Sequence, residues 1–520
     1  MVADVVQRRV EESRAFNLDW ILSELGSFGK YQLILLFLLA FRDGFLAMCN
    51  FHYVFTASQV NFICRVPACM NSTLTHNLTN ICIADAVHAD NGTRNNSTCG
   101  DVILSQDGRC QQITYENYNS IIAEFDLGCD QWKSTLIGTI HNMGLIISFV
   151  VSGVIADRYG RKIIIVSTPL VVGVCGLLKS FSVNIWMLLV LEFIETCFGY
   201  GNASLVLTLE IVSQNSRVVF SSISDILTNI GHSFFGLIAW KIPYWRYTMR
   251  AIYTPLLVVV FYIFLVDEGV RWLLANDKKV EAIHILNKVA KVNNVTLSKT
   301  AKSMMQTLNE EVEKTKLPEE IAERAKEPQI KLLKALRSKK LLLRLLTIAA
   351  CFMFNIFIYY GAMINITHIS GNKYLNYSLL ILVSVPVRIL SAYTLSRFGR
   401  KAPICCANGL CAIFFVTSAF IPQTIWWVPI MLYLLGKMCA SFALFAMTVF
   451  AMEVFPTTSR NTLTNISTTF GRIGSVLAPL APMLVLNLKG FFSMTFKTAL
   501  CALSTLSMNV LYVPPQEVMQ

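Results

Sequence analysis

Charged residues are scarce in this chain. Only 15% of its 520 residues are Asp, Glu, Lys or Arg, whereas 54% are hydrophobic, and the mean hydropathy is +0.54. Soluble domains carry about 25% charged residues, so this composition excludes a soluble protein. The hydrophobic residues come in blocks of roughly 20, enough for a helix to cross a hydrocarbon core of about 30 Å. Because the short alternating segments of a transmembrane barrel are missing, we predict an all-α membrane protein.

Further absences narrow the functional class. The chain has no Walker A sequence, no plausible catalytic cluster and no His/Cys metal set in its apolar segments, so we expect neither an enzyme nor a cofactor or metal. The net charge of +12 comes mostly from Lys and Arg in loops between apolar segments. This is the bias of cytoplasmic loops, and we expect no nucleic-acid partner. The polar start, MVADVVQRRVEESRAF, lacks an apolar core, so we expect no cleavable signal peptide.

A long polar loop over 58–133 combines cysteines with N-glycosylation sequons. Such a set predicts an extracellular, glycosylated loop that is tied by disulfides. A zinc site is the alternative, but the spacing is irregular and paired C-x-x-C motifs are missing. The candidate disulfide residues are Cys64, Cys69, Cys82, Cys99, Cys110 and Cys129. The sequons begin at Asn71, Asn77, Asn91, Asn95 and Asn96.

The apolar blocks predict twelve transmembrane helices with both termini in the cytoplasm. The basic turns fall on one side of the membrane and the sequon loop on the other, as the charge rule requires. The predicted helices span 31–57, 134–156, 163–182, 184–208, 219–240, 249–266, 342–365, 374–396, 402–421, 425–452, 462–487 and 490–512. The predicted domains are a cytoplasmic segment over 1–30, six helices over 31–266, a cytoplasmic helical insert over 267–341, six helices over 342–513 and a cytoplasmic tail over 514–520.

Two motifs occur once in each half of the chain. GVIADRYGRK, at 153–162, has a partial copy in LSRFGRK, at 395–401, and EIVSQNSR, at 210–217, is matched by EVFPTTSR, at 453–460. The offsets, 239 between Arg158 and Arg397 and 243 between the two glutamates, are nearly equal. This predicts two pseudo-symmetric six-helix bundles. The alternative is a chance pair of positive-inside clusters.

These motifs also predict a paired cytoplasmic gate. Two halves that rock about a central site need contacts that hold one state but break easily, and ion pairs of a few kcal/mol serve that purpose. Ser396 stands where the first turn has Asp157, so the second network should be weaker or closed differently. The alternative is that the charges only set topology. The predicted gate residues are Asp157, Arg158, Arg161, Glu210 and Arg217 in the first half and Arg400, Glu453 and Arg460 in the second.

Charges at membrane depth are costly and indicate function. Arg388 and Arg472 lie in predicted helices that offer no acidic residue near them, so we expect each to hold a substrate carboxylate. A structural ion pair is the alternative for both. Arg42 could pair with Glu192 between helices. The tyrosines of YYGAMIN, Tyr359 and Tyr360, could stack on a substrate or simply pack.

GVIADRYGRK resembles the loop between helices 2 and 3 of the major facilitator superfamily. Together with the cysteine-rich first loop, EIVSQNSR, DEGVRWLLANDKKVEAIHIL, YYGAMIN and EVFPTTSRN, it makes the whole chain resemble the solute carrier 22 family of organic cation, organic anion and carnitine transporters. The resemblance implies a plasma-membrane transporter of small organic ions that works by alternating access, as a uniporter or an exchanger. A counter-ion or exchange substrate would then be a further partner.

Within that family, organic anion members are similar at the positions of Arg388 and Arg472, and carnitine members share the second arginine. The tyrosine pair matches the family's aromatic cage. Departures from the family are Glu192, where a basic residue is usual, Arg42–Asp43, and DEGVR after helix 6. We expect organic anions or zwitterions as substrates. The alternatives are an organic cation, with Glu192, Glu195, Asp225 or Asp43 as counter-charge, and a non-transporting receptor on the same fold.

Overall fold

The structure is a computed structural model that describes residues 18–26, 28–65, 112–201, 203–213, 216–314, 339–369, 371–421, 427–455 and 460–480. Its described part is helical except for a two-stranded antiparallel sheet, in which β1 (Phe62–Arg65) pairs with β2 (Gln112–Tyr115). This sheet closes the base of the predicted sequon loop. The sequons and Cys69, Cys82, Cys99 and Cys110 lie outside the described residues, as does the side chain of Cys64. Cys129 is disulfide-bonded.

The first half of the chain forms one helical bundle. α3 runs over Lys30–Asn50 and continues through α4 (Tyr53–Thr56). After the short α6 (Ile121–Glu124) come α7 (Gln131–Tyr159), α8 (Arg161–Lys179), α9 (Ile185–Phe198), α10 (Ala203–Ile211) and α11 (Arg217–Lys241). The bundle ends with α12 (Trp245–Leu257), extended by a 3-10 turn (Val258–Phe261) and α13 (Tyr262–Leu265).

The second half forms another bundle. Its helices are α18 (Lys339–Asn365), α19 (Lys373–Leu382), α20 (Ser384–Phe398), α21 (Lys401–Phe420), α22 (Trp427–Val454), α23 (Arg460–Gly471) and α24 (Ile473–Leu477). Outside both bundles lie the amphipathic α2 (Leu18–Glu24) and the insert helices α14 (Val270–Ala275), α15 (Lys279–Asn293) and α16 (Lys299–Lys314).

Eight helices of the described chain are long and apolar enough to cross a membrane. They correspond to the predicted helices 1–3 and 6–10. Predicted helix 4 is present as α9 and α10, helix 5 as α11, and helix 11 as α23 and α24, while the last predicted helix, 490–512, lies outside the described residues. Helices 4 and 11 fall short as single spans because each is interrupted. The all-α prediction is confirmed, and the described helices are consistent with a twelve-helix bundle.

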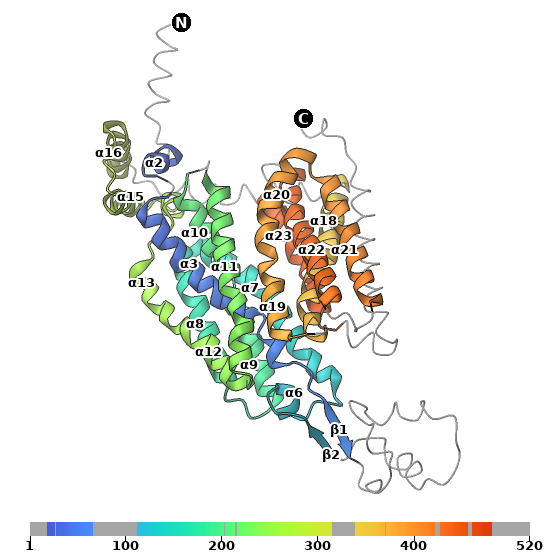
Figure 1. Ribbon diagram of the computed structural model, residues 1–520. Helices are drawn as coiled ribbons and strands as arrows, with labels where there is room; N and C mark the ends of the chain where they lie inside the picture. The colour runs from blue at the N-terminus through green and yellow to red at the C-terminus, as the bar shows by residue number, and fades with distance from the viewer. Residues whose placement is uncertain are drawn as a thin grey trace, which may run out of the picture.

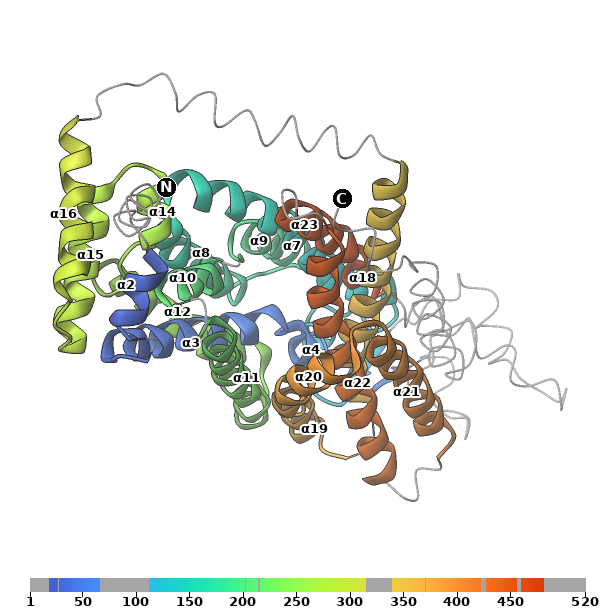
Figure 2. The ribbon, with the colours of Figure 1, turned by 90° about the horizontal axis from the view of Figure 1, so that it is seen from above.

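The two bundles converge at the end that carries β1 and β2, here called the outer end, and diverge toward α2, α15 and α16 (Figure 1). We call this second end the cytoplasmic end after the predicted topology. Seen from above, the two bundles lie side by side, with α15 and α16 beside the first (Figure 2). α11 packs against α19, where Ser378 Oγ donates to the Ser233 carbonyl at 2.8 Å, and the His232 ring and Tyr377 hydroxyl are 2.9 Å apart. α7 packs against α24. The halves therefore meet along the outer part of their interface.

Candidate functional site

A cavity of about 160 Å³ lies between the two bundles. α3 contributes one wall, α7 and the α9–α10 junction a second, and the other bundle the third. The lining residues are Arg42, Asp43, Leu46, Ala47, Asn50, Leu145, Phe149, Tyr200, Gly201, Tyr360 and Arg472. Of the four predicted substrate-binding residues, the structure therefore brings Arg472 and Tyr360 to the same cavity.

The helix interruption between α9 and α10 forms part of this cavity. The chain leaves helical geometry around Tyr200 and Gly201, which frees backbone groups inside the bundle. Ser148 of α7 satisfies them: its hydroxyl donates to the Tyr200 carbonyl at 2.7 Å and accepts from the Tyr200 amide at 3.1 Å. Irregular backbone at membrane depth is tolerated where it lines a cavity, and broken helices are typical of substrate sites in transporters.

Arg472 occupies a second interruption, between α23 and α24. Gly471 and Gly474 flank it and lie directly against Phe352 and Met353 of α18, where a Cβ would clash. The Arg472 guanidinium reaches the opposite bundle and lies 3.8 Å from the ring centre of Phe149. Among the described residues the Arg472 guanidinium makes no ion pair. It is therefore a cation that lines the cavity without being paired to a carboxylate of the described chain.

The two predicted tyrosines face different ways. The Tyr360 ring lies 5.4 Å from that of Phe51, across the interface between the bundles. Tyr359 is turned toward α22, where the buried Lys437 ammonium lies 2.9 Å from its ring centre. Tyr360 lines the cavity and Tyr359 does not, so within the described chain only one of the pair is positioned to touch a ligand there.

Arg388 is not a free cation in this structure. The sequence offers it no acidic partner on its own helix, but α11 of the other bundle supplies Asp225, whose carboxylate is 3.2 Å from the guanidinium. The guanidinium also covers the Phe445 ring at 4.5 Å. Inspecting each helix separately misses this pair, because it forms only when the two bundles come together.

Arg42 does not pair with Glu192, the partner suggested for it above. Its guanidinium contacts the neighbouring Asp43 and donates to Ser204 and Thr168 hydroxyls, each at 2.6 Å. Its Nε donates to the Ile165 carbonyl at 2.9 Å. That carbonyl is free because Pro169, four residues later in α8, has no N–H to donate. The cavity side of Arg42 is thus neutralised by Asp43.

Glu192 belongs instead to a fully buried cluster in the first bundle, which we call the buried charge cluster. It consists of His52, His141, Lys179, Glu192, Glu195 and Tyr253. The Lys179 ammonium lies 2.6 Å from Glu192 and 2.5 Å from Glu195, and Tyr253 donates to Glu195 at 3.1 Å. Glu192 and Glu195 were candidates from the sequence but Lys179 was not, although a lysine inside a predicted membrane helix was a usable signal.

The same cluster has the donor set of a metal site. His52, His141 and Glu192 each place one donor atom within 4.8 Å of the others. However, the Lys179 ammonium already lies on the same carboxylate, and a second cation there would be repelled by it. We therefore assign no metal to these residues.

At the cytoplasmic end of the first bundle, Arg161 joins two elements of the predicted gate. Its guanidinium is 3.2 Å from both Asp157 and Glu210. Glu268, just after the last helix of the bundle, accepts from the backbone amides of Arg161 at 2.7 Å and Lys162 at 3.2 Å. A carboxylate at a helix N-terminus is stabilising, so Glu268 fastens the turn to the insert.

Arg217 lies outside this predicted network. Its guanidinium and that of Arg271 converge on Asp19 of α2, at 2.9 and 2.6 Å. Arg217, which we expected in one network with Asp157, Arg161 and Glu210, thus pairs with α2 instead. Arg158 lies over the Tyr159 ring, 5.4 Å from its centre, and makes no ion pair among the described residues.

The second bundle has a simpler cytoplasmic pair. Arg400 approaches Glu453 to 2.8 Å, with two further hydrogen bonds from its Nε at 2.9 and 3.0 Å. The side chain of Arg460, which begins α23, lies outside the described residues. Within the described chain, none of these pairs bridges the two bundles at the cytoplasmic end.

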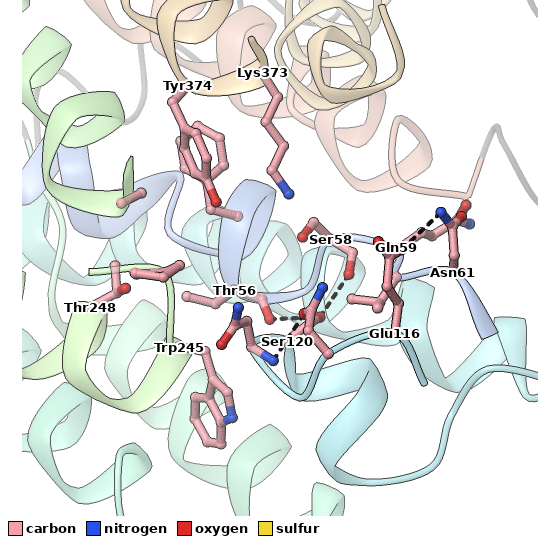
Figure 3. A pocket seen from close by; sticks show the side chains of 16 residues that line it. Thr56, Ser58, Gln59, Asn61, Glu116, Ser120, Trp245, Thr248, Lys373 and Tyr374 are labelled. Carbon is pink, nitrogen blue, oxygen red and sulfur yellow. Dashed lines mark hydrogen bonds between the residues drawn. The ribbon is translucent and has the colours of Figure 1, made fainter. Parts of the chain in front are cut away.

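A further pocket, of about 230 Å³, marks the outer seam between the bundles (Figure 3). Lys373 and Tyr374 of the second bundle face Ser58, Glu116 and other groups of the first. Ser120 braces its wall by donating to the carbonyls of Thr56 at 3.2 Å and Ser58 at 2.7 Å.

A family model and curated relatives of this chain both indicate the same family of transporters. The sequence profile described as the Major Facilitator Superfamily matches residues 113–479. An organic cation transporter protein of Drosophila melanogaster is 25% identical over 482 residues, which are 90% of this chain and 86% of that protein. Solute carrier family 22 member 3 of Mus musculus is 26% identical over 70% of this chain. That alignment spans 64% of the mouse protein, slightly less than two thirds.

Solved structures show the same fold. An inward open conformation of the xylose transporter XylE from E. coli has a TM-score of 0.61, with 14% identity, over 93% of this chain and 96% of that one. A partially occluded inward open conformation of the same transporter scores 0.60, over 93% of this chain and all of that one. At this identity the likeness establishes the arrangement of helices and nothing about the ligand.

Proposed function

The chain belongs to the major facilitator superfamily, as a plasma-membrane transporter of the solute carrier 22 type, and on that premise we propose that it carries small organic anions or zwitterions by alternating access. It is a transporter and not an enzyme. The small organic ion would bind in the cavity between the bundles, and the bundles would expose that cavity to one face of the membrane at a time.

The observation that carries this proposal is the guanidinium of Arg472, which lies in the cavity and makes no ion pair with any residue that the structure describes. A guanidinium stays charged at membrane depth and needs an anion. The second bundle has almost none to offer: between residues 342 and 513, Glu453 is the only Asp or Glu. Since Glu453 is already paired with Arg400 at the cytoplasmic end, a substrate carboxylate is the partner that we propose for Arg472.

The opposite wall of the cavity supports a zwitterion as well as a simple anion. Asp43 lines the cavity and its side chain is 26% exposed, although it contacts Arg42. A substrate ammonium could share this carboxylate while its own carboxylate meets Arg472. Phe149 and Tyr360 would flank the organic body, with Tyr359 supporting Tyr360 from behind at 5.8 Å between ring centres.

We propose different roles for Arg388 and the cytoplasmic pairs. The Arg388–Asp225 pair joins the bundles beside the transport path, so its contacts would change when the bundles rock. The Arg161 and Arg400 networks lie on the cytoplasmic surfaces that must approach each other when that side closes. In the closed state we expect these arginines to gain partners from the opposite bundle.

The second candidate is an organic cation. It is favoured by the relative named an organic cation transporter protein and by the carboxylate of Asp43 in the cavity. In that case Asp43 would be the primary ligand, and Arg472 would repel the substrate unless a further anion neutralised it.

Uptake in cells expressing the protein tests the two candidates. The probes are a labelled monocarboxylate, a labelled betaine and a labelled quaternary amine without a carboxylate. We expect uptake of the first two and a loss of about tenfold or more in Arg472→Ala, because hydrogen bonds to charged groups contribute about 1.5–3 kcal/mol. Arg397→Ala, which removes an exposed arginine at the end of α20, is the matched control.

The proposal fails if only the quaternary amine enters and Asp43→Asn, but not Arg472→Ala, abolishes its uptake. A third result would favour a receptor: the purified protein binds one of the probes, yet reconstituted vesicles show no flux of any of them.

A further inference from the structure

The pocket at the outer seam is a cavity that the proposed transport cycle does not use (Figure 3). It shares no lining residue with the central cavity. Ring contacts across the interface separate the two. The Phe51 ring lies 5.4 Å from that of Tyr360, which lines the central cavity, and the Phe55 ring lies 5.1 Å from that of Tyr374, which lines the outer pocket. The outer pocket is therefore a site of its own.

Both bundles contribute walls to this pocket. The first bundle supplies the end of α4 with the linker that follows it, the segment after β2, the end of α11 and the start of α12. The second bundle supplies Lys373 and Tyr374 at the start of α19. The pocket has this form only while the outer ends of the bundles are together. A ligand that contacts both walls therefore favours the closed outer end over the open one.

The pocket holds one cation and one anion that do not pair with each other. Figure 3 shows Lys373 reaching from α19 into the pocket, with Ser58 and Glu116 on the wall that it faces. The Lys373 ammonium lies 5.2 Å from the Tyr374 ring centre, and Glu116 accepts from the Asn61 amide through Oε2 at 3.1 Å. Within the described chain neither Lys373 nor Glu116 makes an ion pair. Each wall thus offers one charge to a ligand.

The size and lining of the pocket select a small polar molecule. Its volume of about 230 Å³ corresponds to roughly seven or eight water molecules at about 30 Å³ each. Pockets for drug-sized ligands are larger, at about 300–1,000 Å³. The side-chain amides of Gln59, Asn117 and Asn119 also line the pocket, and each amide offers both donors and an acceptor. A compact ligand with two opposite charges fits this combination.

We propose that the outer pocket binds a small zwitterion, with one carboxylate and one ammonium, and that this ligand holds the outer ends of the bundles together. Its carboxylate meets Lys373 of the second bundle, and its ammonium meets Glu116 of the first. The site is regulatory, because an occupied pocket favours the state with a closed outer end and so slows uptake from outside. This inference goes beyond the proposed function: it does not involve Arg472 and holds for any transported substrate.

Binding to purified protein tests the site. The Arg472→Ala variant is the parent, because it lacks the ligand that we propose for the central cavity. The labelled probes are glycine, 4-aminobutyrate and 6-aminohexanoate, which differ in the separation of their charges, and butyrate and butylamine, which keep one charge each. We expect the amino acids to differ in affinity with chain length. Butyrate and butylamine should bind at least about tenfold more weakly than the best amino acid.

Substitutions on the two walls assign the charges. Lys373→Gln should weaken binding of the best amino acid by about tenfold. Glu116→Gln should weaken it by less than about fivefold, because Glu116 is exposed to solvent. Lys373→Glu should abolish binding, and its combination with Glu116→Lys should restore part of it, since the ligand can then bind in the reverse direction. Lys241→Gln, at the exposed end of α11 and outside the pocket, is the matched control.

The regulatory effect has a separate readout. Ser378 is buried where α19 meets α11, so a membrane-impermeant maleimide added to intact cells should label Ser378→Cys only when the outer end opens. The best amino acid at saturating concentration should lower the labelling rate severalfold. Lys373→Gln should remove this protection. Cells that express the protein without the new cysteine give the background from the native thiols.

Four results would overturn the inference. None of the probes could bind to the Arg472→Ala protein. Butyrate or butylamine could bind as tightly as the best amino acid, which would make the ligand a simple ion. The charge-reversed double variant could bind as poorly as Lys373→Glu. The bound amino acid could leave the labelling of Ser378→Cys unchanged, so that it would not hold the bundles together. None of these results depends on which substrate the protein carries, so they are distinct from a failure of the proposed function.

Discussion

The two bundles share a topology and two sequence motifs, but they differ in the sign and the pairing of their charged residues. The first bundle buries acids and bases together, so that the glutamates of α9 meet Lys179 and His141. The second bundle, over 342–513, contains eleven Lys and Arg residues and one acid, Glu453. The shared architecture therefore fixes where the helices lie, but it does not fix the number or the pairing of charged side chains in each half.

A buried lysine in each bundle shows the contrast most directly. Lys179 has two carboxylates within 2.6 Å, whereas Lys437 contacts the ring of Tyr359 and lies 3.4 Å from its carbonyl. Both are fully buried. The first lysine completes a balanced cluster, whereas the second has no carboxylate partner among the described residues of the bundle that also carries Arg472. We infer that the first bundle is internally neutralised and the second is prepared for an anion from outside.

The sharpest way to break this comparison is to make one substitution in both bundles. Lys179→Met leaves two buried carboxylates without their cation and should destabilise the protein by about 3–5 kcal/mol, enough to prevent its expression at the cell surface. Lys437→Met replaces a buried polar amine that has no carboxylate partner among the described residues, and it should be neutral or stabilising. Thermal unfolding of the two purified variants in detergent measures the difference.

The triple variant Lys179→Met, Glu192→Gln, Glu195→Gln is the control for the first substitution, since it removes the two carboxylates together with the ammonium that neutralises them. It should recover part of the lost stability. Equal destabilisation by the two single substitutions would show that the bundles do not differ in how they hold charge.

A second test compares the two cytoplasmic networks. Arg161 is 15% exposed and meets two carboxylates, whereas Arg400 is 34% exposed and meets one. Exposed ion pairs contribute about 0–1 kcal/mol. Arg400→Gln should therefore slow uptake by less than about fivefold, and Arg161→Gln by more. Initial uptake rates, normalised to the amount of protein at the surface, provide the measurement, and the reverse order would contradict the asymmetry.

The smallest expected effect concerns the outer end of the first bundle. Burial alone would raise the pKa of Glu124, but hydrogen bonds from Arg246 and Trp245 outweigh it, so the pKa lies below its ordinary value of 4.5. The ionised carboxylate therefore stabilises the fold above that value, and this contribution is lost as the pH falls through the lowered pKa. Unfolding temperatures between pH 7 and 3 should fall less steeply for Glu124→Gln than for the wild type.

Much of the fold follows from the sequence because membrane helices are specified locally. Blocks of apolar residues and basic turns identified the described helices of both bundles, and α3 and α8 begin within two residues of their predicted starts. Hydropathy treated helices 4 and 11 as continuous, because an interruption such as that at Tyr200 depends on Ser148 from another helix.

The candidate site was less predictable because its members meet across helices. Arg472 and Tyr360 could be selected as a cation and an aromatic residue at membrane depth. That Asp225 neutralises Arg388, or that Asp19 meets Arg217, depends on tertiary contacts between segments distant in sequence. Lys179 was missed because it lies near the end of its helix, where a lysine usually reaches the surface.

The carbonyl that Pro169 leaves free has a consequence for how this protein can evolve. Arg42 fills the hydrogen bond that the proline cannot make, and Ser204 and Thr168 complete the shell around the guanidinium. Restoring an N–H at position 169 would make the backbone compete with Arg42 for the Ile165 carbonyl. Losing the arginine instead would leave this buried carbonyl without a hydrogen-bond donor. The two positions should therefore change together or not at all, so a lineage that abandons Arg42 is expected to abandon Pro169 as well.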